Sequence, residues 1–176
     1  PNRDRFILSK GHAAPALYAI LAEHGVIDHA SLDTLRLIDS PLEGHPNMRR
    51  LPGVEASTGS LGQGLSIGLG HALAGRLDGR AFRTYVMCGD GEMQEGQVWE
   101  AIMAAAHYRV DTLTLIVDHN GAQQSNILPR VLDYRPLAAK LRAFDWHVEE
   151  IDGHDMPAIL SAFASTPPAT SALERR

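Results

Sequence analysis

Residues 83–121 read RTYVMCGDGEMQEGQVWEAIMAAAHYRVDTLTLIVDHNG and contain the pattern that decides the fold. Within this stretch, Arg83–Cys88 has the length and apolar content of a short strand. The segment Gln94–Tyr108 is rich in alanine and repeats apolar residues at helical spacing, which predicts a helix. Thr112–Val117 is a near-continuous apolar run, typical of a strand buried on both faces of a parallel sheet. The stretch is therefore a predicted strand–helix–strand unit.

The same alternation continues toward the carboxyl end of the sequence. It predicts a helix over Pro136–Phe144, a strand over Trp146–Ile151 and a further helix after Asp155. A β-α-β-α-β-α series is typical of a doubly wound α/β fold with a mainly parallel sheet.

The first 80 residues are predicted to be mostly helical, around a turn-rich stretch at Ser40–Gly59. The predicted helices are Ala13–His24, Ser31–Ile38 with Ser31 as its N-cap, and Leu61–Leu77.

Composition excludes several classes of protein. With 16 basic and 21 acidic residues the net charge is -5, whereas a general nucleic-acid binder needs a surplus of positive charge. No apolar stretch is long enough for a membrane span, and no signal segment opens the chain. Cys88 is the only cysteine, so no internal disulfide can form. We expect a soluble, cytoplasmic protein that binds neither nucleic acid nor membrane.

Two polar loops follow the two central strands. Gly89-Asp90-Gly91-Glu92 comes after the first, and Asp118-His119-Asn120-Gly121 comes after the second. In open α/β sheets ligands bind beyond the carboxyl ends of the strands. Glycines let the backbone approach a phosphate, while carboxylate and amide oxygens suit Mg²⁺, which takes about six oxygen ligands. Each loop alone reads as an ordinary turn, but the pair at this spacing favours a site for a metal and a phosphate.

This pair of loops resembles the thiamine diphosphate fingerprint, in which an Asn follows GDG after about thirty residues. Five ordered motifs then resemble the amino-terminal part of transketolases, from about Asp4 to Phe163. They are Asp4–His12, Gly44–Pro46, Gly53–Gly64, Gly89–Gly96 and Ile151–Asp155. The likeness is closest to the amino-terminal subunit of split transketolases, and it implies a three-layer α/β/α thiamine diphosphate-binding fold.

The resemblance also implies roles for particular residues. His12 would contact the cofactor diphosphate, and His45 would line the channel near the thiazolium and the sugar. The backbone of Gly59, Ser60 and Leu61 would meet the aminopyrimidine.

The metal site and the subunit interface follow in the same way. The Mg²⁺ ligands would be Asp90, Asn120 and the main-chain oxygen of Ala122, with Asn120 serving the cofactor as well. The amides of Gly91 and Glu92 would face phosphate, and Glu95 matches a glutamate of the subunit interface.

The implied function is transfer of a two-carbon ketol unit between sugar phosphates, in a homo- or hetero-oligomer with a carboxy-terminal, pyrimidine-binding subunit. We expect residues 1–164 to form an incomplete diphosphate-binding domain, because an SGHPG-like motif, a late histidine and a final strand have no match. Residues 165–176 are expected to be a disordered tail, because prolines and small residues replace any apolar period there. The family has an apolar residue at the position of Gln124, so we expect weakened cofactor binding. A different thiamine diphosphate enzyme, such as a deoxyxylulose phosphate synthase or a 2-oxoacid dehydrogenase component, or a non-catalytic relic are the alternatives.

Overall fold

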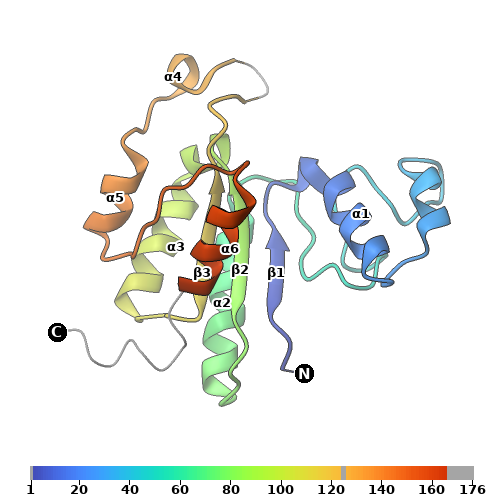
Figure 1. The fold of residues 1–176 in the computed structure, drawn as a ribbon, viewed down its shortest axis with the longest axis horizontal. Coiled ribbons are helices and arrows are strands. Elements are labelled where there is room, and N and C mark those ends of the chain that lie inside the picture. Colours follow the sequence, from blue (N-terminus) through green and yellow to red (C-terminus); the bar gives the residue numbers. More distant parts are fainter. Residues whose placement is uncertain (1, 124–125, 166–176) are drawn as a thin grey trace.

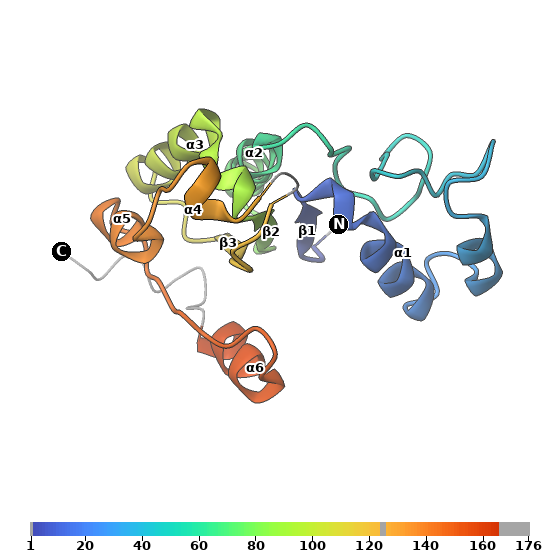
Figure 2. The same ribbon diagram turned by 90° about the horizontal axis from the view of Figure 1, so that it is seen from above.

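The computed structural model describes residues 2–123 and 126–165. Within these ranges, a three-stranded parallel sheet carries helices on both of its faces (Figures 1 and 2). The elements, with η denoting short 3-10 helices, are β1 Arg5–Leu8, η1 Gly11–Ala13, α1 Ala14–Glu23, η2 His29–Thr34, α2 Gln63–Leu77, β2 Thr84–Gly89, η3 Gly91–Gln94, α3 Gly96–His107, β3 Leu113–Asp118, α4 Leu128–Val131, α5 Leu137–Ala143 and α6 Met156–Ser165.

The sheet has the strand order β1-β2-β3, and both pairings are parallel. Leu8 is paired with Met87, and Gly89 is paired with Asp118, so the carboxyl ends of the three strands lie at one edge. The alternate residues Thr84, Val86 and Cys88 of the central strand β2 are buried. The predicted strand–helix–strand unit and the parallel sheet are confirmed, with boundaries shifted by one or two residues.

Helices cover the two faces of the sheet in separate layers (Figure 2). On one face, Gly68 of α2 lies directly against Val86, and α3 packs into the same apolar cluster. On the other face, Met87 packs against the cluster around α1, and the Tyr85 ring meets Phe163 of α6 at a centroid distance of 5.7 Å. The three-layer α/β/α prediction is therefore confirmed.

The predicted helix Ser31–Ile38 is wrong. The chain instead forms the short helix η2, which begins two residues earlier and is capped by the side chain of Asp28, accepting a backbone N–H at 3.2 Å. Leu35 then becomes extended (φ -50°, ψ 123°) and Arg36 has φ 61°, so the helical hydrogen bonding cannot continue. The cap chosen by the fold is Asp28 rather than Ser31.

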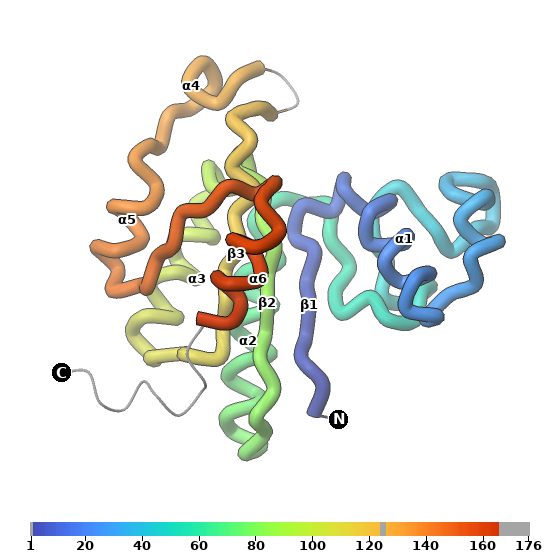
Figure 3. Tube along the Cα trace, in the orientation of Figure 1, coloured from blue at the N-terminus to red at the C-terminus, as the bar shows by residue number. Residues whose placement is uncertain are grey.

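The predicted strand Trp146–Ile151 is also wrong. In the described part of the chain this segment forms no strand and pairs with none, and the tube in Figure 3 runs through it on the way from α5 to α6. The indole of Trp146 donates to the carbonyl of Ile102 at 3.1 Å, and Arg142 donates to the carbonyl of Val148 at 3.3 Å. These bonds tie the segment to α3 and α5.

The remaining differences from the sequence predictions are small. The four residues of β1 form a strand that the sequence pattern did not predict. The predicted disordered tail, apart from Ser165, and Gln124 lie outside the described residues. None of the helices in the described ranges has the length and apolarity needed to cross a membrane.

Candidate functional site

The parallel sheet brings three loops together at the carboxyl ends of its strands. Ser9–His12 follows β1, Asp90–Glu92 follows β2, and Asn120–Ala122 follows β3. The strands run upward in Figure 1, so all three loops lie at the upper edge of the sheet. This is the edge where parallel α/β sheets bind ligands. The structure thus gathers two of the five motifs and the loop that bears Asn120 at one place.

Asp90 is a buried carboxylate, 2% exposed, at the end of β2. Its Oδ1 accepts the Gly91 amide at 2.6 Å, and its Oδ2 accepts the Gly121 amide at 2.6 Å. No Lys, Arg or His forms an ion pair with it within residues 2–123 and 126–165. A buried charge is costly unless it is paired or bound to a metal, so the Asp90 carboxylate is suited to bind a cation.

Asn120 and Ala122 lie beside this carboxylate on the loop after β3. The Asn120 Oδ1 accepts the Ala122 amide at 2.9 Å, and the Asn120 Nδ2 donates to Asp118 Oδ2 at 3.3 Å. This second bond fixes which end of the amide is the oxygen. Asn120 and Ala122 are exposed, so both can reach a ligand from solvent.

Lys10 and Asp118 form an ion pair that joins the loop after β1 to the end of β3. The hydrogen bond from Lys10 holds the pKa of the Asp118 carboxyl below its usual value, and the charge of His12 acts in the same direction. Because Asp118 also accepts from Asn120, the pair couples His12, Lys10 and the predicted metal loop. The sequence analysis did not predict this pair, although Asp118 begins the polar loop after the second predicted strand and Lys10 lies within the motif Asp4–His12.

The predicted aminopyrimidine and sugar residues gather around Gly59. A Cβ placed on Gly11, next to His12, would lie 2.8 Å from the Gly59 nitrogen. A Cβ placed on Gly59, which has φ 144°, would lie 3.0 Å from the His45 ring. The structure therefore packs His45, the 59–61 loop and the start of η1 against one another. Only glycine allows this approach.

Glu95 and Glu92 both lie close to Gly62, at the start of α2. Glu95 is exposed, and a Cβ added to Gly62, the residue after Leu61, would lie only 2.7 Å from the Glu95 Cβ. Glu92 is 2% exposed, and its carboxylate accepts hydrogen bonds from Ser9 Oγ and from the Gly62 amide. The resemblance implies a role for the Glu92 amide alone, whereas in the structure its side chain also holds two other segments in place.

Two buried donors near Asp90 have no hydrogen-bond partner in the described structure: the Tyr134 hydroxyl and Gln123 Nε2. Burial raises the pKa of the Tyr134 phenol, and the negative charge of Asp90 adds to that effect. The Gln123 side chain packs on Gly91, where an added Cβ would lie 3.1 Å from the Gln123 Cβ. Unpaired buried donors call for an acceptor.

These donors and the unpaired acid together fit a divalent cation bound to an oxyanion such as a diphosphate. No group of three or more His, Cys, Asp or Glu side chains in the described ranges could hold a metal alone. Carboxylate, amide and carbonyl oxygens at this edge would instead share the cation with phosphate oxygens, as hard cations permit. The residues present therefore fit the group implied by the resemblance.

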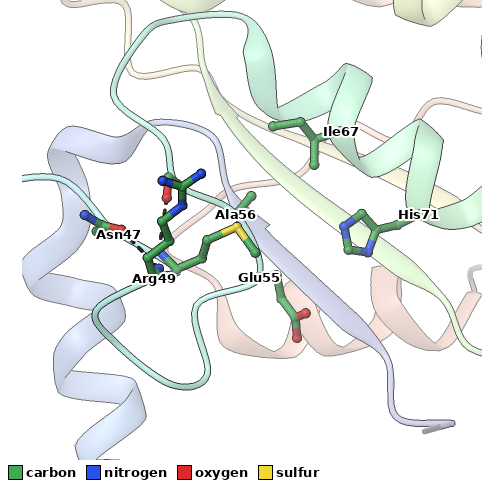
Figure 4. A pocket seen from close by; sticks show the side chains of 8 residues that line it. Asn47, Arg49, Glu55, Ala56, Ile67 and His71 are labelled. Atoms are coloured by element: carbon green, nitrogen blue, oxygen red, sulfur yellow. Dashed lines mark hydrogen bonds between the residues drawn. The ribbon is translucent and has the colours of Figure 1, made fainter.

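A surface hollow of about 500 Å³ lies elsewhere, between α2 and the turn-rich loop (Figure 4). It contains Arg49, Glu55 and His71 but no predicted site residue. Its carboxylate is already neutralised, because Glu55 pairs with Arg3 and with Arg5. The groups that could bind a metal and a phosphate therefore lie in the loops at the strand ends and not in this hollow.

Comparison with known proteins identifies the family. The sequence profile described as "Transketolase, thiamine diphosphate binding domain" matches residues 1–171. The chain is 46% identical over 162 residues to the 6-deoxy-6-sulfo-D-fructose transketolase subunit SqwG of Clostridium sp. (strain MSTE9), covering 92% of this chain and 59% of that relative. It is 42% identical over 164 residues to one of the subunits of the apulose-4-phosphate transketolase of Phocaeicola vulgatus, covering 93% of this chain and 58% of that relative.

Solved structures give the same result. Transketolase from Campylobacter jejuni subsp. jejuni NCTC 11168 superposes with a TM-score of 0.89 at 32% identity, covering 97% of this chain and 28% of that one. A Pichia stipitis transketolase in complex with sedoheptulose-7-phosphate gives a TM-score of 0.90 at 32% identity, covering 94% and 26%. This chain therefore spans under two thirds of the relatives it matches. Motifs, fold and relatives agree that it belongs to the family of transketolase thiamine diphosphate-binding domains.

Proposed function

We propose that this chain binds thiamine diphosphate together with Mg²⁺ and acts as the diphosphate-binding part of a transketolase-type transferase. The observation that carries the proposal is the buried carboxylate of Asp90, which has no cationic partner in the described ranges and lies near two buried donors without acceptors. When bound, the cofactor supplies a nucleophilic carbon for cleaving and forming the carbon–carbon bond beside a carbonyl group.

Some of the residues at the strand ends would bind the metal ion, and others would bind the diphosphate of the cofactor. Asp90, the Asn120 Oδ1 and the main-chain oxygen of Ala122 would bind the cation. The Gly91 and Glu92 amides would face the diphosphate. In the present structure the Gly91 amide donates to Asp90 at 2.6 Å, so a phosphate oxygen would have to share or replace that bond. Removing water around these groups would strengthen each electrostatic contact.

The remaining predicted residues would orient the two ends of the reaction site. His12 would contact the diphosphate, and the backbone of Gly59, Ser60 and Leu61 would bind the aminopyrimidine. His45 would bind the sugar, and its position against Gly59 supports a shared site. Glu95 would lie at the subunit interface, and its exposure beside Gly62 supports that position.

The reaction would be transfer of a two-carbon ketol unit from a ketose phosphate to an aldose phosphate. Support comes from relatives named for phosphorylated or sulfonated sugars and from a solved transketolase holding sedoheptulose-7-phosphate. Relatives named as subunits support a partner chain, which would supply the pyrimidine-binding domain and its activating glutamate in a homo- or hetero-oligomer. We propose that residues 1–164 form the diphosphate-binding domain. We also propose that the protein acts in the cytoplasm.

Calorimetric titration with thiamine diphosphate, with and without Mg²⁺, tests the binding site. Asp90→Asn should weaken Mg²⁺-dependent binding by about tenfold or more, the usual effect of losing a contact to a charged group. Asp111→Asn is the matched control, because Asp111 lies just before β3 at the opposite end of the sheet. Equal binding without Mg²⁺, or equal affinity of the two variants, would refute the site.

A coupled assay tests the reaction. The purified chain is mixed with cofactor, Mg²⁺, a ketose phosphate and an aldose phosphate, with and without a candidate pyrimidine-binding partner. Ketol transfer should require both chains, because this one has no residue assigned to activate the cofactor. Decarboxylation of pyruvate in place of ketol transfer would point to another thiamine diphosphate enzyme, and binding without turnover beside the partner would point to a non-catalytic domain.

A further inference from the structure

Glu92 joins three segments of the chain that are distant in sequence. Its Oε1 accepts from Ser9 Oγ, in the loop after β1, and from the Gly62 amide at 2.8 Å, at the start of α2. Its Oε2 accepts from the Gly89 amide at 3.2 Å, at the end of β2. Ser9 Oγ in turn accepts the Gly64 amide at 3.1 Å. One buried side chain thus receives donors from three separate segments.

The start of α2 depends on this network because it has no cap of its own. Its N-cap residue is Gly62, which offers no side chain and has φ 80°. The first N–H groups of a helix need acceptors from outside the helix. The carboxylate of Glu92 and the hydroxyl of Ser9 supply two of them, and a negative charge at this end is also favoured by the helix dipole.

Close packing leaves the backbone at this point little freedom. A Cβ built on Gly64 would fall on the Ser9 side chain, and one built on Gly62 would fall on Glu95. The helix end therefore sits directly on the loop after β1. Hydrogen bonds to a buried carboxylate are stronger than neutral ones, so this arrangement is held firmly.

Each of the three segments continues directly into residues of the proposed cofactor site. Ser9 precedes Lys10–His12, Gly62 follows Gly59–Leu61, and Gly89 precedes Asp90. We infer that Glu92 is a positioning residue, whose side chain sets the spacing between the loop after β1, the 59–61 loop and the metal-binding Asp90. The inference rests on the proposed function and adds to it a role that the Glu92 amide alone would not have.

The role makes Glu92 different from a residue that only stabilises the fold. A merely structural group would lower stability without changing cofactor affinity in the folded protein. A positioning group changes the affinity because a small displacement separates binding groups that must act together. The two roles are distinguished by measuring affinity under conditions where every variant is folded.

The experiment compares Glu92→Ala, Glu92→Gln and Ser9→Ala in the full chain. Thr84→Val is the matched control, because the Thr84 hydroxyl is buried without a partner at the opposite end of β2. Amide hydrogen exchange is followed at Gly62, Gly64 and Gly89, with the Val86 amide as internal reference. Titration with thiamine diphosphate and Mg²⁺ is made on the same samples, and a second series includes the pyrimidine-binding partner.

We expect Glu92→Ala to raise exchange at Gly62 and Gly89 by about tenfold or more and to weaken cofactor binding by a similar factor. Glu92→Gln keeps one acceptor oxygen and should lie between Glu92→Ala and the unchanged protein. Ser9→Ala should act chiefly at Gly64, and it remains informative if Glu92→Ala does not fold. Thr84→Val should change neither measurement.

The outcomes separate this inference from the proposed function. Unchanged exchange at Gly62 and Gly89 in Glu92→Ala overturns the network itself. Raised exchange with unchanged cofactor affinity overturns the positioning role and leaves a structural one. If the unchanged protein binds no cofactor even with the partner, the proposed function fails and the positioning role fails with it, whereas the exchange data still decide whether the network exists.

Discussion

Replacing two glycines of α2 by alanine, one at a time, should stabilise the chain at Gly70 but not at Gly68. Gly68 and Gly70 lie two residues apart in the same helix, but Gly68 faces the sheet and Gly70 faces solvent. A Cβ on Gly68 would fall on the Val86 side chain in the middle of β2, whereas a Cβ on Gly70 would meet nothing within 4 Å. The pair separates helix propensity from packing against the sheet.

The magnitudes follow from these contacts. Both variants gain about 1 kcal/mol because alanine is the better helix former. Gly68→Ala also incurs an overpacking cost of roughly 1–3 kcal/mol, since Val86 or the helix must move. Gly70→Ala should therefore stabilise the chain by about 1 kcal/mol, and the two variants should differ by roughly 1–3 kcal/mol. For a chain of this size that difference is a shift of roughly 2–12 °C in Tm.

Thermal and urea unfolding of both variants, followed by circular dichroism, measures the difference directly. Because the propensity gain is common to both, it cancels when the variants are compared. Equal midpoints for Gly68→Ala and Gly70→Ala would refute the close contact of α2 with β2. That contact matters for the site, since α2 carries the Gly62 end and β2 carries Asp90.

Two further predictions concern titratable groups. The hydrogen bond from Lys10 lowers the pKa of Asp118, so the stability that this carboxylate contributes should be fully present above its ordinary pKa of 3.8 and lost as the pH falls through the lower folded value. In urea unfolding, Asp118→Asn should therefore differ in stability from the unchanged protein at neutral pH and converge with it in acid. A difference that persists in strong acid would contradict this. Burial raises the pKa of the Cys88 thiol to about 12, and the negative charge of Glu92 acts in the same direction. A thiol reagent at pH 8 should therefore label the protein only after denaturation. Rapid labelling of the native chain would show instead that Cys88 is accessible.

Much of the fold and of the candidate site was predictable because it depends on local pattern. The apolar run of β3 and the helical spacing of α3 identify their elements without any partner, and Asp90 and Asn120 stand where parallel strands end. The ordered motifs then indicated the family, which the comparisons confirmed. The assigned roles of His12, His45 and Glu95 stay predictions.

The sequence predictions of secondary structure were wrong where the tertiary structure did not support the local pattern. The segment Trp146–Ile151 has the length of a strand, but a strand exists only beside another strand. Hydrogen bonds to α3 and α5 fix this segment outside the sheet. The predicted helix at Ser31–Ile38 stopped early because Arg36 adopts a left-handed conformation. Conversely, β1 has only four residues, too few for a period, and becomes a strand through its pairing with β2.

The sequence by itself determined the central order β2, α3 and β3, the family and the chemical groups at the ends of β2 and β3, since periodicity and motifs are properties of neighbouring residues. Only the tertiary structure decided how those groups are paired. Ser9 and Glu92 are separated by 83 positions, and Lys10 and Asp118 by 108. Such pairs depend on the register of the parallel strands and on how closely α2 approaches the sheet. Neither the register nor this packing distance is encoded in any short stretch of residues.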